Sequence, residues 1–343
     1  MQKKFFPIYF LTLVNVLSFT INMPVYPFII KKYSESPVVY GLLLATFSLF
    51  QFLATPIIGK LSDIYGRKPL LLITQAGTTL SWLIFGSAFF FPGIKVLSLI
   101  SLPVVVILFS RAVDGITGGN GSVSNAYLSD VTTVKERTKI FGYTGAITGI
   151  AIVVGPALGG FASSTKYEFL GSSMLGFIVS LFTLTYLYFG LKESLKNKSV
   201  NDIDYKKLYK KFNIAKNLQN FKGQKKLSRL FKLEALSAFV MSSYTSFVVL
   251  YVVDKFGLNE SQVGLFFLII GGFFIFNQAF AVKKITEKYG DTIALKTGLS
   301  ALVFGFTMVT FMPNIWLYFI FIYFVNLGIA LNLTTIRSLV TKT

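Results

Sequence analysis

The stretch LLLATFSLFQFLATPIIGKLSDIYGRKPLLLITQAGTTLSWLIFGS, residues 42–87, places two long apolar segments on either side of a short charged loop. These apolar segments belong to the ranges 37–58 and 69–91. A helix of about 20 residues crosses the roughly 30 Å hydrocarbon layer of a membrane. Each range therefore predicts one membrane-spanning helix, and the loop predicts a tight return on one side of the membrane.

The composition is typical of membrane-spanning helices along the whole chain. Of the 343 residues, 53% are hydrophobic and only 14% are charged, whereas soluble domains carry roughly 25% charged residues. The length criterion predicts about ten spans, so we expect an all-α, multi-pass protein of the cell membrane. The first span is too long for a signal peptide and lacks a small-residue cleavage site, which predicts that it is retained. The expected spans cover residues 5–30, 37–58, 69–91, 98–128, 138–163, 168–190, 234–254, 261–281, 292–311 and 314–335.

The net charge of +19 is distributed unevenly between the expected loops. If the N-terminus is cytoplasmic, the cytoplasmic loops hold nearly all the lysines and arginines, as the positive-inside rule requires. This distribution predicts a cytoplasmic N-terminus, with anionic membrane lipid and not nucleic acid as the partner of the basic loops. The loops on the opposite side carry only Lys31, Lys32, Lys95, Lys166 and Lys255.

Cysteine and histidine are both absent from the sequence. Their absence excludes disulfide bonds, thiol chemistry and the commonest transition-metal ligands. Any proton transfer therefore falls to carboxylates, and we expect no metal and no cofactor. The sequence contains no Gly-x-x-x-x-Gly-Lys-Ser/Thr phosphate-binding loop, so ATP is not expected to drive the protein. A nucleophile and base pair is also missing, which argues against an enzyme.

A polar run divides the expected spans into two groups. Residues 191–232 are too charged to insert into a membrane and predict a cytoplasmic basic linker. An amphipathic helix on the membrane surface and a solvated linker remain alternatives for this segment. Residues 1–190 form the expected N-terminal six-helix half, and residues 233–343 hold four further spans.

The two groups share an internal repeat. KLSDIYGRK at residues 60–68 aligns with KITEKYGDT at residues 284–292, and each of these loops follows the second span of its group. The alignment indicates duplication of a six-span unit. On that basis residues 233–343 are an incomplete, four-helix C-terminal half, and the chain is expected to stop two helices early.

The loop GKLSDIYGRK resembles the signature loop between helices two and three of the major facilitator superfamily. In that family the acid at the position of Asp63 ties the loop to the start of helix eleven. The resemblance implies the major facilitator fold, with a substrate site between two halves near the middle of the membrane. Since helix eleven is not among the expected spans, Asp63 is expected to lack that partner. The gating residues that the resemblance implies are Gly59, Asp63, Gly66, Arg67 and Lys68.

Residues 111–160 carry a second resemblance, to helices four and five of drug and proton antiporters, and the tetracycline-efflux branch is the most similar. Arg111 and Gly115 form its Arg-x-x-x-Gly element. The resemblance implies proton-coupled export of small amphipathic compounds. The tetracycline branch carries acids where this chain has Asn15 and Ser81, which argues against tetracycline itself as the substrate. The helix-five element comprises Gly142, Gly155, Pro156, Gly159 and Gly160.

Helix packing alone could explain this helix-five element. Small residues let helix backbones approach closely, and a Gly-Pro step weakens one helical turn. A packing role and a coupling role therefore both remain open for Gly155, Pro156, Gly159 and Gly160.

Arg111 and Asp114 lie three residues apart inside an expected span, so they share a helix face and can pair. Ionisable residues inside a membrane are costly unless they face a partner or an internal cavity, and they are therefore candidates for function. We expect Asp114 to exchange a proton and Arg111 to modulate its affinity for that proton. A purely structural ion pair is the alternative.

Polar side chains elsewhere in the spans are candidates to line a substrate cavity. Hydrogen bonding between helices is the alternative role for each of them, because buried amides in lipid need partners. The resemblance also implies gating contacts by Asp130 and Arg137, in the short loop after the fourth span. The expected cavity residues are Asn15, Asn22, Gln51, Asn120, Asn125, Asn277, Gln278 and Asn326.

These features predict a monomeric secondary transporter that exports small amphipathic molecules by alternating access and uses the proton gradient. One alternative is an uptake symporter for a sugar or metabolite on the same fold. A second alternative is a non-transporting fragment, because a four-helix half would leave one lateral face open to lipid.

Overall fold

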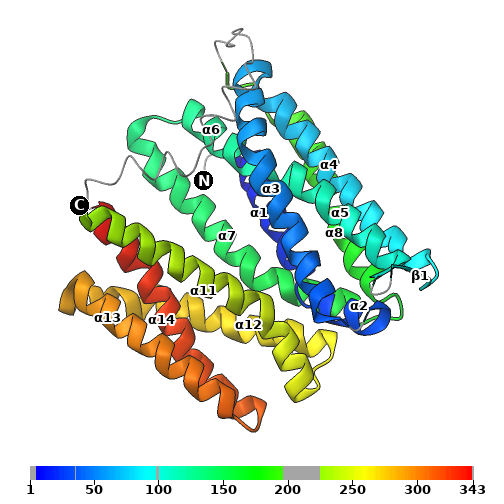
Figure 1. Cartoon of the computed structure of the whole chain (residues 1–343). Helices are drawn as coiled ribbons and strands as arrows, with labels where there is room; N and C mark the ends of the chain where they lie inside the picture. The colour runs from blue at the N-terminus through cyan, green and yellow to red at the C-terminus, as the bar shows by residue number, and fades with distance from the viewer. Residues whose placement is uncertain (1–4, 35, 98–99, 196–224, 342–343) are drawn as a thin grey trace. The chain divides into compact units, whose positions relative to one another are not determined.

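The computed structural model describes residues 5–34, 36–97, 100–195 and 225–341, and these residues are almost entirely helical (Figure 1). The chain divides into two compact units. Unit 1 comprises residues 1–200 and 249–268, and unit 2 comprises residues 201–248 and 269–343. Most of the expected linker, residues 196–224, lies outside the described residues.

Unit 1 is a bundle of helices with one small hairpin. The hairpin pairs β1 (Lys95–Leu97) with β2 (Ile100–Ser101) in antiparallel fashion. The unit also contains the C-terminal end of α11 (Lys225–Phe256) and the start of α12 (Glu260–Phe276). Its other helices are α1 (Phe6–Thr20), α2 (Tyr26–Tyr33), α3 (Pro37–Tyr65), α4 (Arg67–Ser87), η2 (Ala88–Phe90), α5 (Leu102–Thr117), η3 (Gly118–Asn120), α6 (Gly121–Val131), α7 (Val134–Ser163) and α8 (Phe169–Gly190).

Local sequence signals explain where several of these helices begin. Helices α1, α2, α3 and α5 each have proline in the first two positions, where the missing N–H would be unpaired anyway and the fixed φ suits a helix. Helix α7 begins with a capping box between Thr133 and Glu136, which satisfies two backbone N–H groups at the helix start. Helix α3 ends before Gly66, whose φ of +111° favours glycine.

Eight helices among the described residues are long and apolar enough to cross a membrane, judged by length and composition. One of them, Glu260–Phe311, contains 52 residues and is interrupted at Gly290, which has a φ of 76°. Helix α1 is a shorter apolar helix, since the turn at residues 21–25 separates it from α2. With the long segment counted as two crossings and α1 with α2 as one, the structure confirms the expected α-helical membrane fold of about ten spans.

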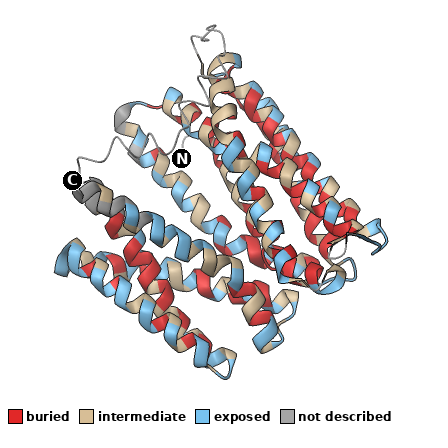
Figure 2. Ribbon diagram, viewed as in Figure 1, coloured by how far each residue is buried: buried red, intermediate tan, exposed pale blue. Residues whose placement is uncertain are grey.

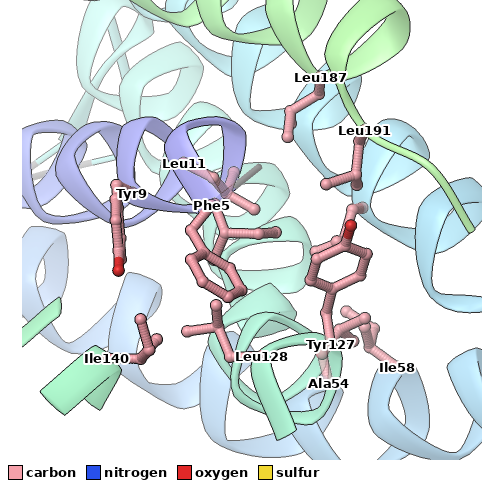
Figure 3. Packing of buried hydrophobic residues seen from close by; sticks show 13 residues of the cluster. Phe5, Tyr9, Leu11, Ala54, Ile58, Tyr127, Leu128, Ile140, Leu187 and Leu191 are labelled. Carbon is pink, nitrogen blue, oxygen red and sulfur yellow. The ribbon is translucent and has the colours of Figure 1, made fainter. Parts of the chain in front are cut away.

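The core of unit 1 consists of apolar side chains that several helices share. One cluster joins Leu11 of α1, Leu71 of α4, Leu128 of α6 and Leu187 of α8, all of them buried. Phe5, just before α1, points toward Leu128 in this cluster (Figure 3). Many residues along the helices are exposed (Figure 2). Large apolar side chains are among them, which is what surfaces in contact with lipid tails require.

Unit 2 contains the greater part of α11, the C-terminal part of α12, the π-helix η4 (Asn277–Ala281), α13 (Val282–Phe311) and α14 (Ile315–Thr341). Helices α13 and α14 pack closely, because a Cβ atom added at Gly305 would meet Val325 and one at Gly328 would meet the Gly298 carbonyl. Small residues of this kind allow close helix approach within a membrane. Gly290 and Gly66, which occupy the same position of the sequence repeat, both have positive φ.

Candidate functional site

The central feature of unit 1 is an ion pair on α5. Arg111 Nη1 lies 3.2 Å from Asp114 Oδ2, and the two side chains are 1% and 2% exposed. The residues are one helical turn apart, as their spacing in the sequence predicts. A charge taken out of water is tolerated only when it is paired and hydrogen-bonded. Arg111 and Asp114 therefore stabilise each other in their charged forms.

Aromatic rings and hydroxyl groups surround this ion pair. The guanidinium carbon of Arg111 lies 5.7 Å from the centre of the Trp82 ring and 5.2 Å from that of Phe85. Such cation–π contacts stabilise a desolvated cation. The hydroxyls of Thr78 and Ser81, both on α4, approach the Asp114 carboxylate. Aromatic rings and hydroxyl groups of α4 therefore surround the ion pair on α5.

The hydrogen-bonding capacity of the site is not fully used. Arg111 Nη2 lies 3.4 Å from Ser110 Oγ, and the Tyr26 hydroxyl also approaches Arg111. The buried Nε of Arg111, however, has no hydrogen-bond partner among the described residues. A buried donor without a partner is costly, and it is a feature that occurs at functional sites.

Three of the expected cavity residues make hydrogen bonds between helices. Asn15 on α1 and Asn120 in η3 form a reciprocal amide pair, with N···O distances of 2.7 and 3.3 Å. Gln51 Nε2 on α3 donates to the Gly118 carbonyl at 3.0 Å. These bonds tie α1 and α3 to the segment between α5 and α6. They match the alternative role of interhelical hydrogen bonding.

Two other expected cavity residues of unit 1 differ from these three and from each other. Asn22 is fully buried and donates from Nδ2 to the Ser18 carbonyl at 3.3 Å, while its Oδ1 has no partner among the described residues. Asn125 on α6 is exposed. Ser81, the departure from the tetracycline branch on α4, is buried and donates to the Thr78 carbonyl at 2.8 Å.

The helix-five glycines allow α7 to approach its neighbours very closely. A Cβ atom added at Gly155 would collide with Thr20, and one at Gly159 would collide with the Ile21 carbonyl. Gly160 lies against the backbone of Gly264 in α12. Gly142 has open space around it. Gly155, Gly159 and Gly160 therefore all lie at close helix contacts, and Pro156 lies buried within the same stretch.

Gly59–Lys68, the sequence-predicted gating loop, forms a compact network of charges around Arg67. The Nη1 atom of Arg67 lies 2.6 Å from Asp63 Oδ1, and its Nε lies 3.2 Å from Asp130 Oδ2 at the end of α6. Ser62 Oγ accepts a further hydrogen bond from Arg67 at 2.6 Å. Asp63 therefore has a partner within its own loop. Arg137 donates to the Ser129 carbonyl at 3.1 Å, beside this network.

Glu193, which follows α8, contacts the same loop although the sequence did not single it out. Its carboxylate accepts hydrogen bonds from the backbone N–H groups of Arg67 at 2.9 Å and Lys68 at 3.2 Å. The pKa of Glu193 is lowered, because these bonds and those from the N–H groups of Ser194 and Leu195 outweigh the opposing effect of partial burial. The carboxylate is therefore held in its charged form.

The expected cavity residues of unit 2 lie on η4 and α14. Asn277 is fully buried, and neither its Nδ2 nor its Oδ1 has a partner among the described residues. Gln278 donates to Thr334 Oγ1 at 3.0 Å, and Asn326 donates to the Ile322 carbonyl at 3.0 Å. Asn332 is buried and also lacks partners among the described residues. The π-helix at Asn277 is a geometry that is frequent at functional sites.

A separate cavity of about 340 Å³ lies beside α2 in unit 1. Lys32 and Glu168 line it and form an ion pair with an N···O distance of 2.6 Å. Phe28 and Phe169 provide an apolar wall. No group of three or more acidic side chains among the described residues is placed to hold a metal ion.

The sequence profile of the Major Facilitator Superfamily matches residues 8–343. The chain belongs to this superfamily. Because major facilitator proteins are transporters, the chain is a transporter of small molecules and not an enzyme.

Major facilitator proteins of drug resistance are among the relatives. The class B tetracycline resistance protein of Escherichia coli is 27% identical over 340 residues, covering 97% of this chain and 79% of that protein. Multidrug resistance protein 2 of Bacillus subtilis is 26% identical over 285 residues, covering 81% and 65%. The structure of the human organic anion transporter MFSD10 shares the fold with a TM-score of 0.70 at 19% identity, covering 98% of this chain and 84% of that one.

Sequence reasoning missed the aromatic surroundings of Arg111 and the role of Glu193 in this major facilitator chain. Nothing in the sequence separates Trp82 and Phe85 from the many aromatic residues that face lipid, since the chain holds 37 phenylalanines. Glu193 carried a usable signal, because it is an isolated acid at the start of a lysine-rich segment directly after the sixth span.

Proposed function

We propose that this chain exports small amphipathic compounds in exchange for protons, by alternating access and as a monomer. The observation that carries the proposal is the buried ion pair of Arg111 and Asp114. Asp114 is the carboxylate that lies deep inside a predicted span, and an intramembrane acid of this kind is a candidate proton carrier.

The environment of the pair supports reversible protonation at Asp114. Arginine stays charged under all working conditions, so the exchangeable proton belongs to the carboxylate. When Asp114 takes up a proton, Arg111 loses its counter-charge but keeps its contacts with the rings of Trp82 and Phe85. Those contacts lower the cost of the uncompensated cation. Protonation thereby changes the charge balance of α5, which can bias the transporter between two states.

Substrate class is proposed from the relatives and from the chain's own residues. The names of the relatives refer to tetracycline resistance and multidrug resistance. Asn15 and Ser81 stand where the tetracycline branch carries acids, and both are engaged in hydrogen bonds. We therefore infer a substrate that is amphipathic but is not tetracycline, consistent with an aromatic content of 16%.

The proposed topology places the N-terminus and the basic loops in the cytoplasm, next to anionic lipid. The asymmetry of lysine and arginine between loops supports this orientation. In that orientation the loop of Asp63 and Arg67 faces the cytoplasm. The chain has no cysteine, so single cysteines introduced at exposed Tyr65 and exposed Tyr167 would report the topology by their reaction with an impermeant maleimide on intact cells.

Everted membrane vesicles energised with a pH gradient test the proposed function directly. Ethidium and tetracycline serve as probes, and we expect gradient-dependent accumulation of ethidium and none of tetracycline. Asp114→Asn should abolish accumulation while membrane insertion is retained. Glu287→Gln is the matched control, because Glu287 is exposed and pairs only loosely with Lys283. Gradient-driven accumulation by Asp114→Asn at the normal rate would exclude the assigned role of Asp114.

A further inference from the structure

Two sets of hydrogen bonds join the N-terminus of α4 to the C-terminal end of α8 and the residues that follow it. Glu193, beyond the C-terminus of α8, accepts hydrogen bonds from the first two N–H groups of α4. Lys68, in the first turn of α4, donates from Nζ to the Tyr188 carbonyl in the last turn of α8 at 2.9 Å. An acid at a helix start and a lysine at a helix end each complement the helix dipole.

Glu193 is anchored on both of its sides. Two residues before it, Leu191 is buried in the same apolar cluster as Leu11 and Leu128. One residue after it, Ser194 donates from Oγ to Asp130 Oδ2 at 3.1 Å. The Glu193 carboxylate also accepts the N–H groups of Ser194 and Leu195, which folds the chain back around it. These contacts fix the carboxylate in place against the loop.

The loop is shaped to receive this carboxylate. Gly66 has a φ of +111°, which turns the chain sharply between α3 and α4. A Cβ atom added at Gly66 would meet the Glu193 carboxylate directly. The next residue, Arg67, receives the Glu193 contact on its backbone and holds Asp63 and Asp130 with its side chain. One residue thus connects the segment after α8 to the charge network of the loop.

We propose that Glu193 is a positioning residue that seats the Asp63–Lys68 loop, so that the start of the linker controls the gating network through the N-terminus of α4. The inference rests on the proposed transport function for its consequence, but the seating itself is a property of the folded chain. Glu193 lies far along the chain from Arg111 and Asp114 on α5. Its loss should therefore change how fast the transporter cycles and leave substrate affinity unchanged.

Hydrogen exchange tests the seating without any substrate. In the full-length protein in lipid nanodiscs, Glu193→Ala should speed exchange at the Arg67 and Lys68 amides by about fivefold or more, as expected for loss of a helix cap. Glu193→Gln should give a smaller increase, because one oxygen remains to accept. Lys192→Ala, at an exposed neighbouring side chain, is the control and should leave these amides unchanged. Unchanged exchange in Glu193→Ala would overturn the inference whatever the transport result.

Transport kinetics test the consequence. In everted vesicles with ethidium, Glu193→Ala should lower the maximal rate about threefold or more with KM unchanged, since cycling and not binding is affected. A cysteine introduced by Tyr65→Cys, at the exposed end of α3, should react faster with maleimide when Glu193→Ala is present. Equal labelling rates, or a rise in KM with an unchanged maximal rate, would contradict a positioning role. Absence of ethidium transport by the unmodified protein would refute the proposed function and leave the exchange result standing.

Discussion

The two arginine–aspartate clusters of unit 1 differ in how much water they meet. Arg111 and Asp114 are 1% and 2% exposed and have rings and hydroxyls around them. Arg67 is 9% exposed, but its partners Asp63 and Asp130 are 44% and 26% exposed. The two arginine–aspartate clusters therefore lie in surroundings of different effective dielectric constant. Coulomb energies at similar distances differ several-fold between such surroundings.

This difference in exposure supports the two roles proposed for the clusters, proton exchange and gating. A buried pair is expensive to break, so it suits a step in which a proton replaces a counter-charge. A half-exposed network is inexpensive to rearrange, so it suits contacts that form and break in every transport cycle. Perturbing each cluster in turn should therefore give effects of different size and different sensitivity to salt and pH.

Breaking the buried pair should have the largest effect on stability. Arg111→Leu leaves the Asp114 carboxylate buried without its partner, and we expect the free energy of unfolding to fall by about 3–5 kcal/mol. Thermal unfolding in detergent, followed by tryptophan fluorescence, measures this loss. The double variant Arg111→Leu/Asp114→Leu should recover most of it, because no unpaired charge remains. A loss below about 1 kcal/mol in the single variant would show that the pair is solvated after all.

The Gly66 turn should be the next most sensitive point. Gly66→Ala forces a side chain into positive φ, which costs about 1–3 kcal/mol, and also pushes the Glu193 carboxylate away from α4. Gly290→Ala is a matched control, since Gly290 has a φ of +76° but open space around its Cβ position. Urea unfolding of both variants should show a greater loss for Gly66→Ala. Equal losses would mean that displacement of Glu193 adds nothing.

Sequence reasoning succeeded where partners are close in the chain. The pairing of Arg111 with Asp114 follows from helical spacing, and the α3–α4 return follows from an apolar–charged–apolar pattern. It failed where partners are distant, because no periodicity reports contacts across more than a hundred residues. Asn15 pairs with Asn120, and Glu193 contacts Arg67. Three of the amides expected to line a cavity, Asn15, Gln51 and Asn120, make hydrogen bonds between helices, and a single sequence does not say which face of a helix meets a neighbour.

The Glu193 contact should respond to pH in a defined direction. The pKa of Glu193 is lowered in the folded protein, with Arg67, Lys68 and Asp130 nearby and Tyr127 facing it. Its stabilising effect is therefore present at neutral pH and is lost as pH falls through the lowered pKa. Amide exchange at Lys68, compared between the unmodified protein and Glu193→Gln at each pH, should differ at pH 7. The two proteins should converge as pH falls through the lowered pKa, and a difference that does not narrow on acidification would refute this assignment.

The smallest effect is expected at the exposed end of the loop network. Asp63→Asn removes a carboxylate that is 44% exposed, so the free energy of unfolding should fall by only about 0.2–1 kcal/mol. Salt should shrink this difference further, because the screening length falls from about 10 Å at 0.1 M to about 3 Å at 1 M. Asp114→Asn, in the buried cluster, should lower the free energy of unfolding by more, and that loss should not change with salt. If the loss in the Asp63 variant were instead insensitive to salt, the cluster of Asp63 and Arg67 would be the one shielded from water. The proposed division of roles between gating and proton exchange would then be reversed.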